Sequence, residues 1–246
     1  MPVPTSADQF VERLEALATP EHAKGYLGYF KTGAGAYGAG DVFLGVDMGQ
    51  VFALAKQAID MPLEEIEKLL ESPIHEVRVG AVSIMDAQAR RKKTPPHQRQ
   101  ALFDLYLRRH DRINNWDLVD RAATFVVGRY LFDKPRDILY QLARSPNLWE
   151  RRTAIVSTDF FIRQGDVADT FVIAELLLHD DHDLIHKAVG GWLRAAGTKD
   201  RQQLLRFLDT HAATMPRVAL RYAIEHLDQA QREHYLRMKR NERQGA

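Results

Sequence analysis

The sequence contains no cysteine, and this absence excludes several classes of protein at once. Disulfide frameworks and thiolate chemistry both need that residue. No apolar run approaches the roughly 20 residues that cross a bilayer. The first ten residues also lack the basic segment and the apolar stretch of a secretory signal. We therefore expect a cytoplasmic protein with no membrane segment.

Net charge is also nearly absent, at +1 for 246 residues, but the charges are distributed unevenly. Residues 1–85 carry 6 Lys and Arg against 12 Asp and Glu, whereas residues 86–165 carry 16 against 9. A basic block inside a nearly neutral chain favours a surface that faces a polyanion. The same excess is also compatible with cations spread over solvated helix faces.

Apolar residues recur at helical spacing over most of the chain, which predicts an all-α fold. A first helix is predicted over residues 6–17, with Thr5 or Ser6 as its N-terminal cap. Further helices are predicted over residues 137–143, 148–163, 169–178, 184–196, 201–208 and 216–227. A turn rich in His and Asp at residues 179–186 offers metal-type ligands, but polar residues are expected in such a turn, and we predict no metal site there.

Internal similarity suggests how the predicted helices are arranged. The pairs Ser72-Pro73 and Ser145-Pro146 lie 73 residues apart, about twice a repeat of 36 residues. A basic residue also recurs early in successive second helices, at Arg78, Arg151, Lys187 and Arg217. This pattern predicts an α-solenoid of HEAT-like antiparallel helix pairs, in which those cations form a ladder along one groove.

We therefore expect a single curved domain over residues 1–246 with a concave basic groove. Residues 1–45 would hold N-terminal helices and a glycine-rich loop, residues 46–228 the helical repeats, and residues 229–246 a C-terminal tail. Nothing in the pattern demands a partner subunit, so we expect a monomer.

The segment around Trp116 contains the residues best suited to chemistry. Asn114 or Asn115 can cap a helix in which Trp116 and Asp120 lie four residues apart on one face. A carboxylate beside an indole could hold a developing cation through its charge and through the ring quadrupole. The alternative is that Trp116 belongs to the core and that the acidic residues simply favour the helix N-terminus.

Several short motifs occur in an order that resembles the bacterial DNA alkylation repair glycosylases of the AlkD family. These motifs begin at Phe43, Trp116, Leu148, Ile185 and Met215, so that they cover nearly the whole chain. The resemblance implies HEAT-like helical repeats that bind double-stranded DNA. It also implies excision of positively charged N-alkylated purines, such as 3-methyladenine and 7-methylguanine, by hydrolysis of the N-glycosidic bond without metal or cofactor.

The resemblance also implies roles for particular residues. Asp120 matches the catalytic carboxylate, Trp116 the aromatic residue beside the damaged nucleotide, and Arg152 the arginine that contacts the backbone near the lesion. Trp192 is the candidate for the second active-site tryptophan. The DNA-binding residues expected are Arg78, Arg151, Lys187, Arg194, Arg217 and Arg221.

Two departures from the family pattern leave other functions open. Gly191 stands where the family usually has its second tryptophan, and Trp192 follows one position later; residues 47–50 also lack the proline and arginine common in relatives. A non-catalytic DNA-binding relative is therefore one alternative. A helical-repeat scaffold that binds a protein partner is another. Lesion preference, and whether Arg90 to Lys93 contact DNA, stay open from sequence.

Overall fold

Helices dominate the structure, a computed structural model that describes residues 3–238. In that part of the chain the only strand-like pairing is one isolated parallel bridge between Val42 and Ile74. The all-α prediction is therefore confirmed. No helix within these residues is long and apolar enough to cross a membrane. The chain divides into two compact units, Met1–Tyr130 and Leu131–Ala246, which we describe separately.

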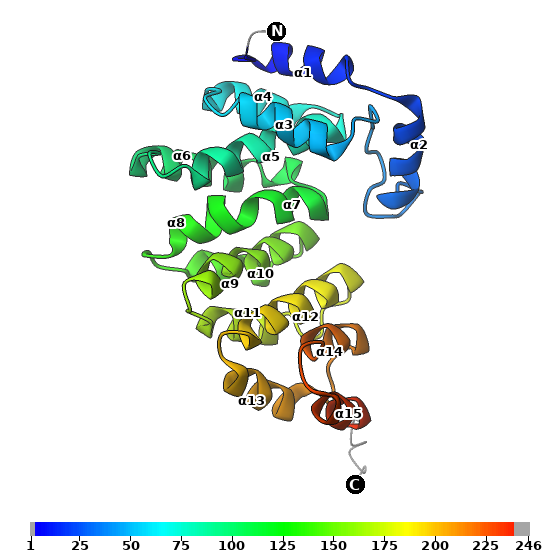
Figure 1. Cartoon of the computed structure of the whole chain (residues 1–246), viewed down its shortest axis with the longest axis vertical. Helices are drawn as coiled ribbons and strands as arrows, with labels where there is room; N and C mark the ends of the chain where they lie inside the picture. Colours follow the sequence, from blue (N-terminus) through cyan, green and yellow to red (C-terminus); the bar gives the residue numbers. More distant parts are fainter. Residues whose placement is uncertain (1–2, 239–246) are drawn as a thin grey trace. The chain divides into compact units, whose positions relative to one another are not determined.

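The first unit contains seven complete α-helices, a 3-10 turn and a π-helical turn within its described residues (Figure 1). The α-helices are α1 (Ala7–Glu15), α2 (Pro20–Tyr29), α3 (Met48–Gln57), α4 (Leu63–Glu71), α5 (His75–Arg90), α6 (Pro96–Arg108) and α7 (Trp116–Ala122). The 3-10 turn is His110–Arg112, the π-helical turn is Ala123–Gly128, and the short α8 (Arg129–Leu131) follows it. Ser6 caps α1, as the sequence predicts.

Helix α5 is the centre of the first unit. It packs against α3, α4, α6 and α7, and almost all of its side chains are buried. Burial on every side explains why its apolar residues do not form a single stripe. Polar side chains on α5 are therefore buried as well, among them His75, Glu76 and Arg78, and each needs a partner.

The second unit consists of seven further helices within its described residues. They are α9 (Asp137–Ala143), α10 (Leu148–Arg163), α11 (Ala168–Leu176), α12 (Asp183–Gly197), α13 (Arg201–His211), α14 (Arg217–Ala223) and α15 (Gln229–Arg237). Helices α10, α12 and α14 pack in succession, while α9, α11 and α13 each pack against α10 or α12. Helix α15 occupies part of the segment for which we expected a tail; residues 239–246 lie outside the described residues.

The two Ser-Pro pairs form the same local structure in the two units. The guanidinium of Arg78 donates a hydrogen bond to the carbonyl of Ser72 at 2.9 Å. Likewise Arg151 donates to the carbonyl of Ser145 at 3.0 Å. Each arginine thus binds the turn that precedes its own helix. The similarity between these two Ser-Pro segments, which lie 73 residues apart, therefore reflects a repeated structure.

Both arginines also form an ion pair with an aspartate from another segment of the same unit. Arg78, with a side chain 3% exposed, lies 2.6 Å from Asp41, and Arg151 lies 2.5 Å from Asp180. At these two positions of the expected cationic ladder, the guanidinium groups bind partners of their own unit. The Arg78 side chain is buried, and its charge is compensated by Asp41.

A π-helical turn follows α7 directly. Such turns hold an extra residue and are frequent near functional sites. Here the turn spans Ala123–Gly128, and Phe125 within it lies under the guanidinium of Arg90 at 3.7 Å. The sequence did not reveal this turn, because its residues are mostly apolar and fit an ordinary helix.

Gly190 lets two helices of the second unit approach closely. A Cβ added there would lie 2.4 Å from the Ala219 carbonyl oxygen and 2.6 Å from the Tyr222 Cβ, both on α14. A Cβ added at Gly191 would meet no atom within 4 Å. Of these two neighbouring glycines, only Gly190 is required by packing.

Replacing Gly190 with alanine should lower the free energy of unfolding by about 1–3 kcal/mol, because the added methyl would push α14 away from α12. Gly191→Ala is the matched control and should leave stability unchanged or raise it by up to about 1 kcal/mol, since alanine favours a helix. Urea unfolding measures both values. Equal effects of the two substitutions would contradict the close approach.

Candidate active site and nucleic-acid interface

Helix α7 carries Trp116 at its first position and Asp120 one turn later. Asn115 precedes the helix, and its Oδ1 accepts a hydrogen bond from the Trp116 amide at 2.8 Å. Because residues four apart share one face of a helix, the indole and the carboxylate emerge on the same side of α7. Asp120 is exposed and Trp116 is half-buried, so that solvent reaches both.

Aromatic side chains of the segment around α2 pack against the Trp116 ring. The ring centroid of Phe30 lies 5.9 Å from that of Trp116 in a stacked arrangement, and the Tyr29 ring lies at the same distance edge-on. Phe30 is 2% exposed, whereas Tyr29 is 63% exposed. The Trp116 indole therefore contacts the buried Phe30 ring on one side and the exposed Tyr29 ring on another. Neither contact was predicted, because the segments are far apart in sequence.

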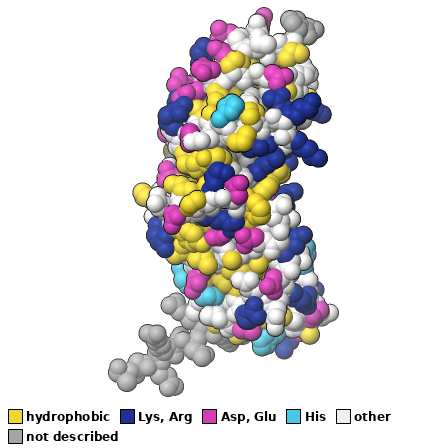
Figure 2. All heavy atoms as spheres, turned by 90° about the vertical axis from the view of Figure 1, so that its left-hand side faces the viewer, with side chains coloured by type: hydrophobic (Ala, Val, Ile, Leu, Met, Phe, Trp, Pro, Cys, Tyr) yellow, Lys and Arg dark blue, Asp and Glu magenta, His cyan; other side chains and the backbone are white. Residues whose placement is uncertain are grey.

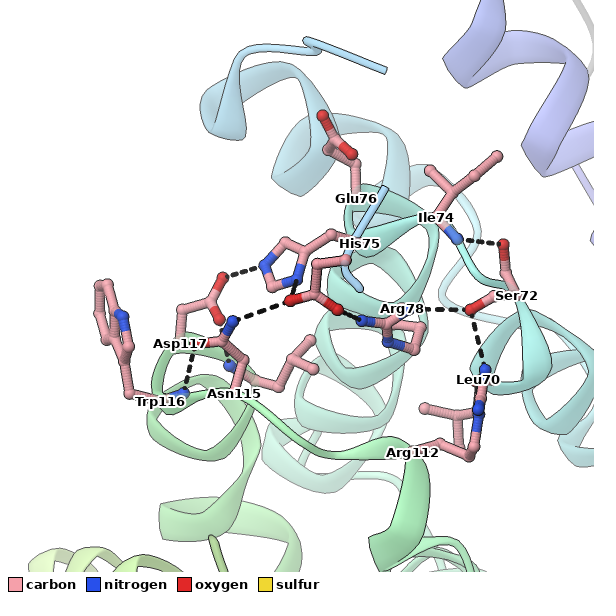
Figure 3. A network of polar contacts seen from close by, with 12 residues as sticks. Leu70, Ser72, Ile74, His75, Glu76, Arg78, Arg112, Asn115, Trp116 and Asp117 are labelled. Atoms are coloured by element: carbon pink, nitrogen blue, oxygen red, sulfur yellow. Dashed lines mark hydrogen bonds and ion pairs between the residues drawn. The ribbon is translucent and has the colours of Figure 1, made fainter. Parts of the chain in front are cut away.

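Behind Trp116 lies a buried network of charged groups, drawn in Figure 3. The His75 Nε2 lies 2.8 Å from the Asp117 Oδ2, and its Nδ1 lies 3.3 Å from the Asp41 Oδ2. Arg78 pairs with the other oxygen of Asp41. The His75 side chain is fully buried, and those of Asp41 and Asp117 are 7% and 16% exposed. Two cations thus face two carboxylates next to the start of α7.

The carboxylates keep His75 charged. Burial alone would lower the pKa of His75, but the hydrogen bonds and charges of Asp117 and Asp41 raise the pKa to about 9. Burial would likewise raise the pKa of Asp41, yet the His75 hydrogen bond and the Arg78 charge hold that pKa below its usual value. The imidazole is therefore an imidazolium at neutral pH.

In the second unit, the residues at the start of α10 bind neighbouring backbone. Arg152 is 8% exposed and donates to the carbonyl of Leu184 at 2.8 Å. Arg151 pairs with Asp180 and binds two carbonyls of the preceding turn. The side chain of Arg151 is 18% exposed. Arg151 thus connects α10 to the turn before α12, and Arg152 connects α10 to the first turn of α12.

Helix α12 carries three of the predicted residues. It runs without interruption from Asp183 to Gly197, so no bulge near Gly191 changes the direction of Trp192. One residue on an α-helix is a rotation of about 100°, so the half-buried Trp192 ring leaves α12 in a different direction from the open side of Gly191. Lys187 pairs with Asp183 at 2.7 Å, and Arg194 pairs with Glu225.

Two further predicted cations lie on α14. Arg217 and Arg221 are both exposed, and Arg217 donates to the carbonyl of Leu236 at 2.8 Å.

In the first unit, cations cluster as well. In the upper part of Figure 2, Lys and Arg side chains gather along the right margin, and Asp and Glu side chains lie mostly along the left.

The His- and Asp-rich turn before α12 is used for local structure. His182 accepts a hydrogen bond from the Leu184 amide at 3.2 Å, and His186 contacts the carbonyl of Asp180. Within residues 3–238 we find no group of three His, Asp or Glu side chains arranged to hold a metal ion.

The family model described as DNA alkylation repair enzyme matches residues 10–227. The chain belongs to this DNA alkylation repair enzyme family. Its role therefore lies in the repair of alkylated DNA. Among curated proteins, no sequence matches.

One solved structure supports the fold of the repair family. It is described as a predicted DNA alkylation repair enzyme from Enterococcus faecalis, and it matches with a TM-score of 0.68 and 19% sequence identity. The match covers 86% of this chain and 97% of that one. At this identity the likeness concerns the fold, which agrees with the predicted solenoid class.

Raising the pH from 6.5 to about 9 should lower the free energy of unfolding of this repair-family protein. His75 has a pKa of about 9 in the folded chain and an ordinary value of 6.5 when unfolded, so its stabilisation is complete below pH 6.5 and is lost as the pH rises through 9. The effect is at most roughly 3 kcal/mol. Urea unfolding of the protein and of His75→Gln across this range measures it, and an equal decline in both would contradict the assignment.

Proposed function

We propose that this protein is a DNA glycosylase that removes cationic N-alkylated purines, of the 3-methyladenine and 7-methylguanine type, in base-excision repair. The observation that carries the proposal is the exposed Asp120 carboxylate one turn after the half-buried Trp116 indole. Family membership supplies the context of alkylated DNA. The alternative of a protein-binding scaffold has no comparable support.

The chemistry needs few groups. A cationic base departs as a neutral molecule, so the enzyme need not supply a general acid. The developing sugar cation then has to be stabilised and water directed to it, and an ionised carboxylate does both. An indole face adds cation–π attraction of about 1 kcal/mol where the site is exposed. We assign the carboxylate role to Asp120 and the aromatic role to Trp116.

The second unit would contribute contacts to DNA phosphates. The proposed contacts are Lys187, Arg194, Arg217 and Arg221, with Arg152 near the lesion as the family resemblance implies. Trp192 stays in the proposal as an aromatic contact from α12, although its position differs by one residue from the family pattern. Arg78, Arg151 and Arg152 all have mostly buried side chains that bind carbonyls inside their own units, so Arg152 is kept only on the family resemblance and the other two are left out.

A non-catalytic DNA-binding protein is the second candidate. It is favoured by the uninterrupted α12, in which Trp192 does not replace the family's tryptophan at Gly191. Such a protein would bind duplex DNA in a salt-dependent way but would leave no abasic sites. The release of free base from methylated DNA distinguishes the two candidates.

Asp120→Asn should reduce the single-turnover rate of 7-methylguanine release by about 100-fold or more, because the amide cannot stabilise the sugar cation or accept a proton from water. DNA affinity should change little. Asp104→Asn is the matched control, since Asp104 is an exposed aspartate on α6 of the same unit. Unchanged release by the Asp120 variant would rule out the assigned mechanism.

Arg221→Gln should weaken binding to duplex DNA and lower the dependence of log Kd on log salt by about 0.9, the value for one lost phosphate contact. Arg206→Gln serves as the control, because Arg206 is also exposed but lies on α13, in the other layer of the unit. Fluorescence anisotropy at several salt concentrations gives both slopes. The phosphate contact is excluded if the two variants behave alike.

A further inference from the structure

The His75 imidazole lies where three segments of the first unit meet. It belongs to the first residue of α5, and it contacts Asp117 on α7 and Asp41 in the segment of residues 41–46, which we call the strap. The strap lies along the start of α5, where the His75 amide donates to the carbonyl of Val42 at 2.8 Å. One side chain therefore connects α5, α7 and the strap.

The strap is held by several polar groups besides His75. Glu76 accepts hydrogen bonds from the amides of Leu44, Gly45 and Val46, the closest at 2.7 Å. Asn115, the cap of α7, donates to Asp41 at 3.0 Å. The strap is connected to α7 by the Asn115–Asp41 hydrogen bond and by the bridge through His75. Of these two, only the His75 bridge loses a proton as the pH rises through 9.

The same imidazole is linked to Trp116 through a ring contact. The His75 ring lies 4.6 Å from the Phe30 ring, and Phe30 stacks on Trp116. Asp117, the main partner of His75, stands in the first turn of α7 between Trp116 and Asp120. The position of that turn therefore sets the positions of both proposed site residues.

We propose that His75 is a positioning residue for base excision: its imidazolium clamps the first turn of α7 to the strap and so fixes Trp116 and Asp120. This inference rests on the proposed glycosylase function. His75 itself is fully buried, so it acts through Asp117 and Phe30 rather than on DNA.

The charges around His75 determine how the clamp responds to pH. Asp41 faces it from the strap and Asp117 from α7, while Arg78 and Glu76 lie on its own helix and Arg112 lies near Arg78. From α2, Tyr26 binds the strap carbonyl of Val46 and keeps its proton, because burial raises its pKa above 10. Loss of the His75 proton would remove the cation between the two carboxylates, leaving Arg78 paired with Asp41 and Asp117 without its cationic partner. Repulsion between the strap and α7 would then loosen the turn.

The first experiment measures single-turnover excision of 7-methylguanine from pH 6 to 10. The protein should lose activity reversibly with a midpoint near pH 9, while DNA affinity changes less than about twofold from pH 6 to 9. His75→Gln should release base at least about tenfold more slowly at pH 7 and show no loss near pH 9. His110→Gln is the control, because His110 is also buried in this unit but packs against Tyr106. A rate and pH profile of His75→Gln like those of the unaltered protein would overturn the proposal.

The second experiment does not depend on excision or on the folding of His75→Gln. It follows the imidazole signals of His75 and the indole signal of Trp116 by NMR in the unaltered protein, with Trp116→Phe for assignment. Both signals should change together near pH 9. A Trp116 signal that ignores the titration of His75 would overturn the clamp. If both signals move but no alkylated base is released at any pH, the glycosylase function fails while the clamp stands.

Discussion

Two carboxylates can be buried beside the start of α7 only because two cations are buried with them. Asp41 and Asp117 meet His75 and Arg78, and removing one member would leave a charge in the interior without compensation. Apolar packing tolerates small shifts, but paired charges at 2.6–2.8 Å do not. The ion pairs therefore fix the orientation of α7. They also fix the directions of Trp116 and Asp120, which lie on the exposed side of that helix.

Helices that depend on local signals could be predicted from the sequence. The predicted bounds of α9 and α10 agree with the structure, because apolar spacing and the Asn147 cap are both local. The buried network could not be predicted in this way. His75 and Asp117 lie 42 residues apart, and a single sequence gives no reason to pair them. The sequence predicts that Trp116 and Asp120 lie on one side of a helix, because they are only four residues apart.

Recurrence of a residue type does not show what the residue does. Arg78 and Arg151 each bind the Ser-Pro turn that precedes their own helix, and this role is internal to the repeat. From the sequence, both are expected in a ladder of cations along one groove. Cations that stay exposed, such as Arg221, are the better candidates for contact with a polyanion. Burial, which sequence alone does not give, separates the two groups.

The π-helical turn Ala123–Gly128 has a consequence for comparing this chain with its relatives. A π-helical turn arises when one residue is inserted into an α-helix. A relative whose corresponding helix is regular would align with this chain only if a one-residue gap is placed there. Without that gap, every position after Ala122 in that helix would be compared with the wrong neighbour, and equivalent side chains would look substituted.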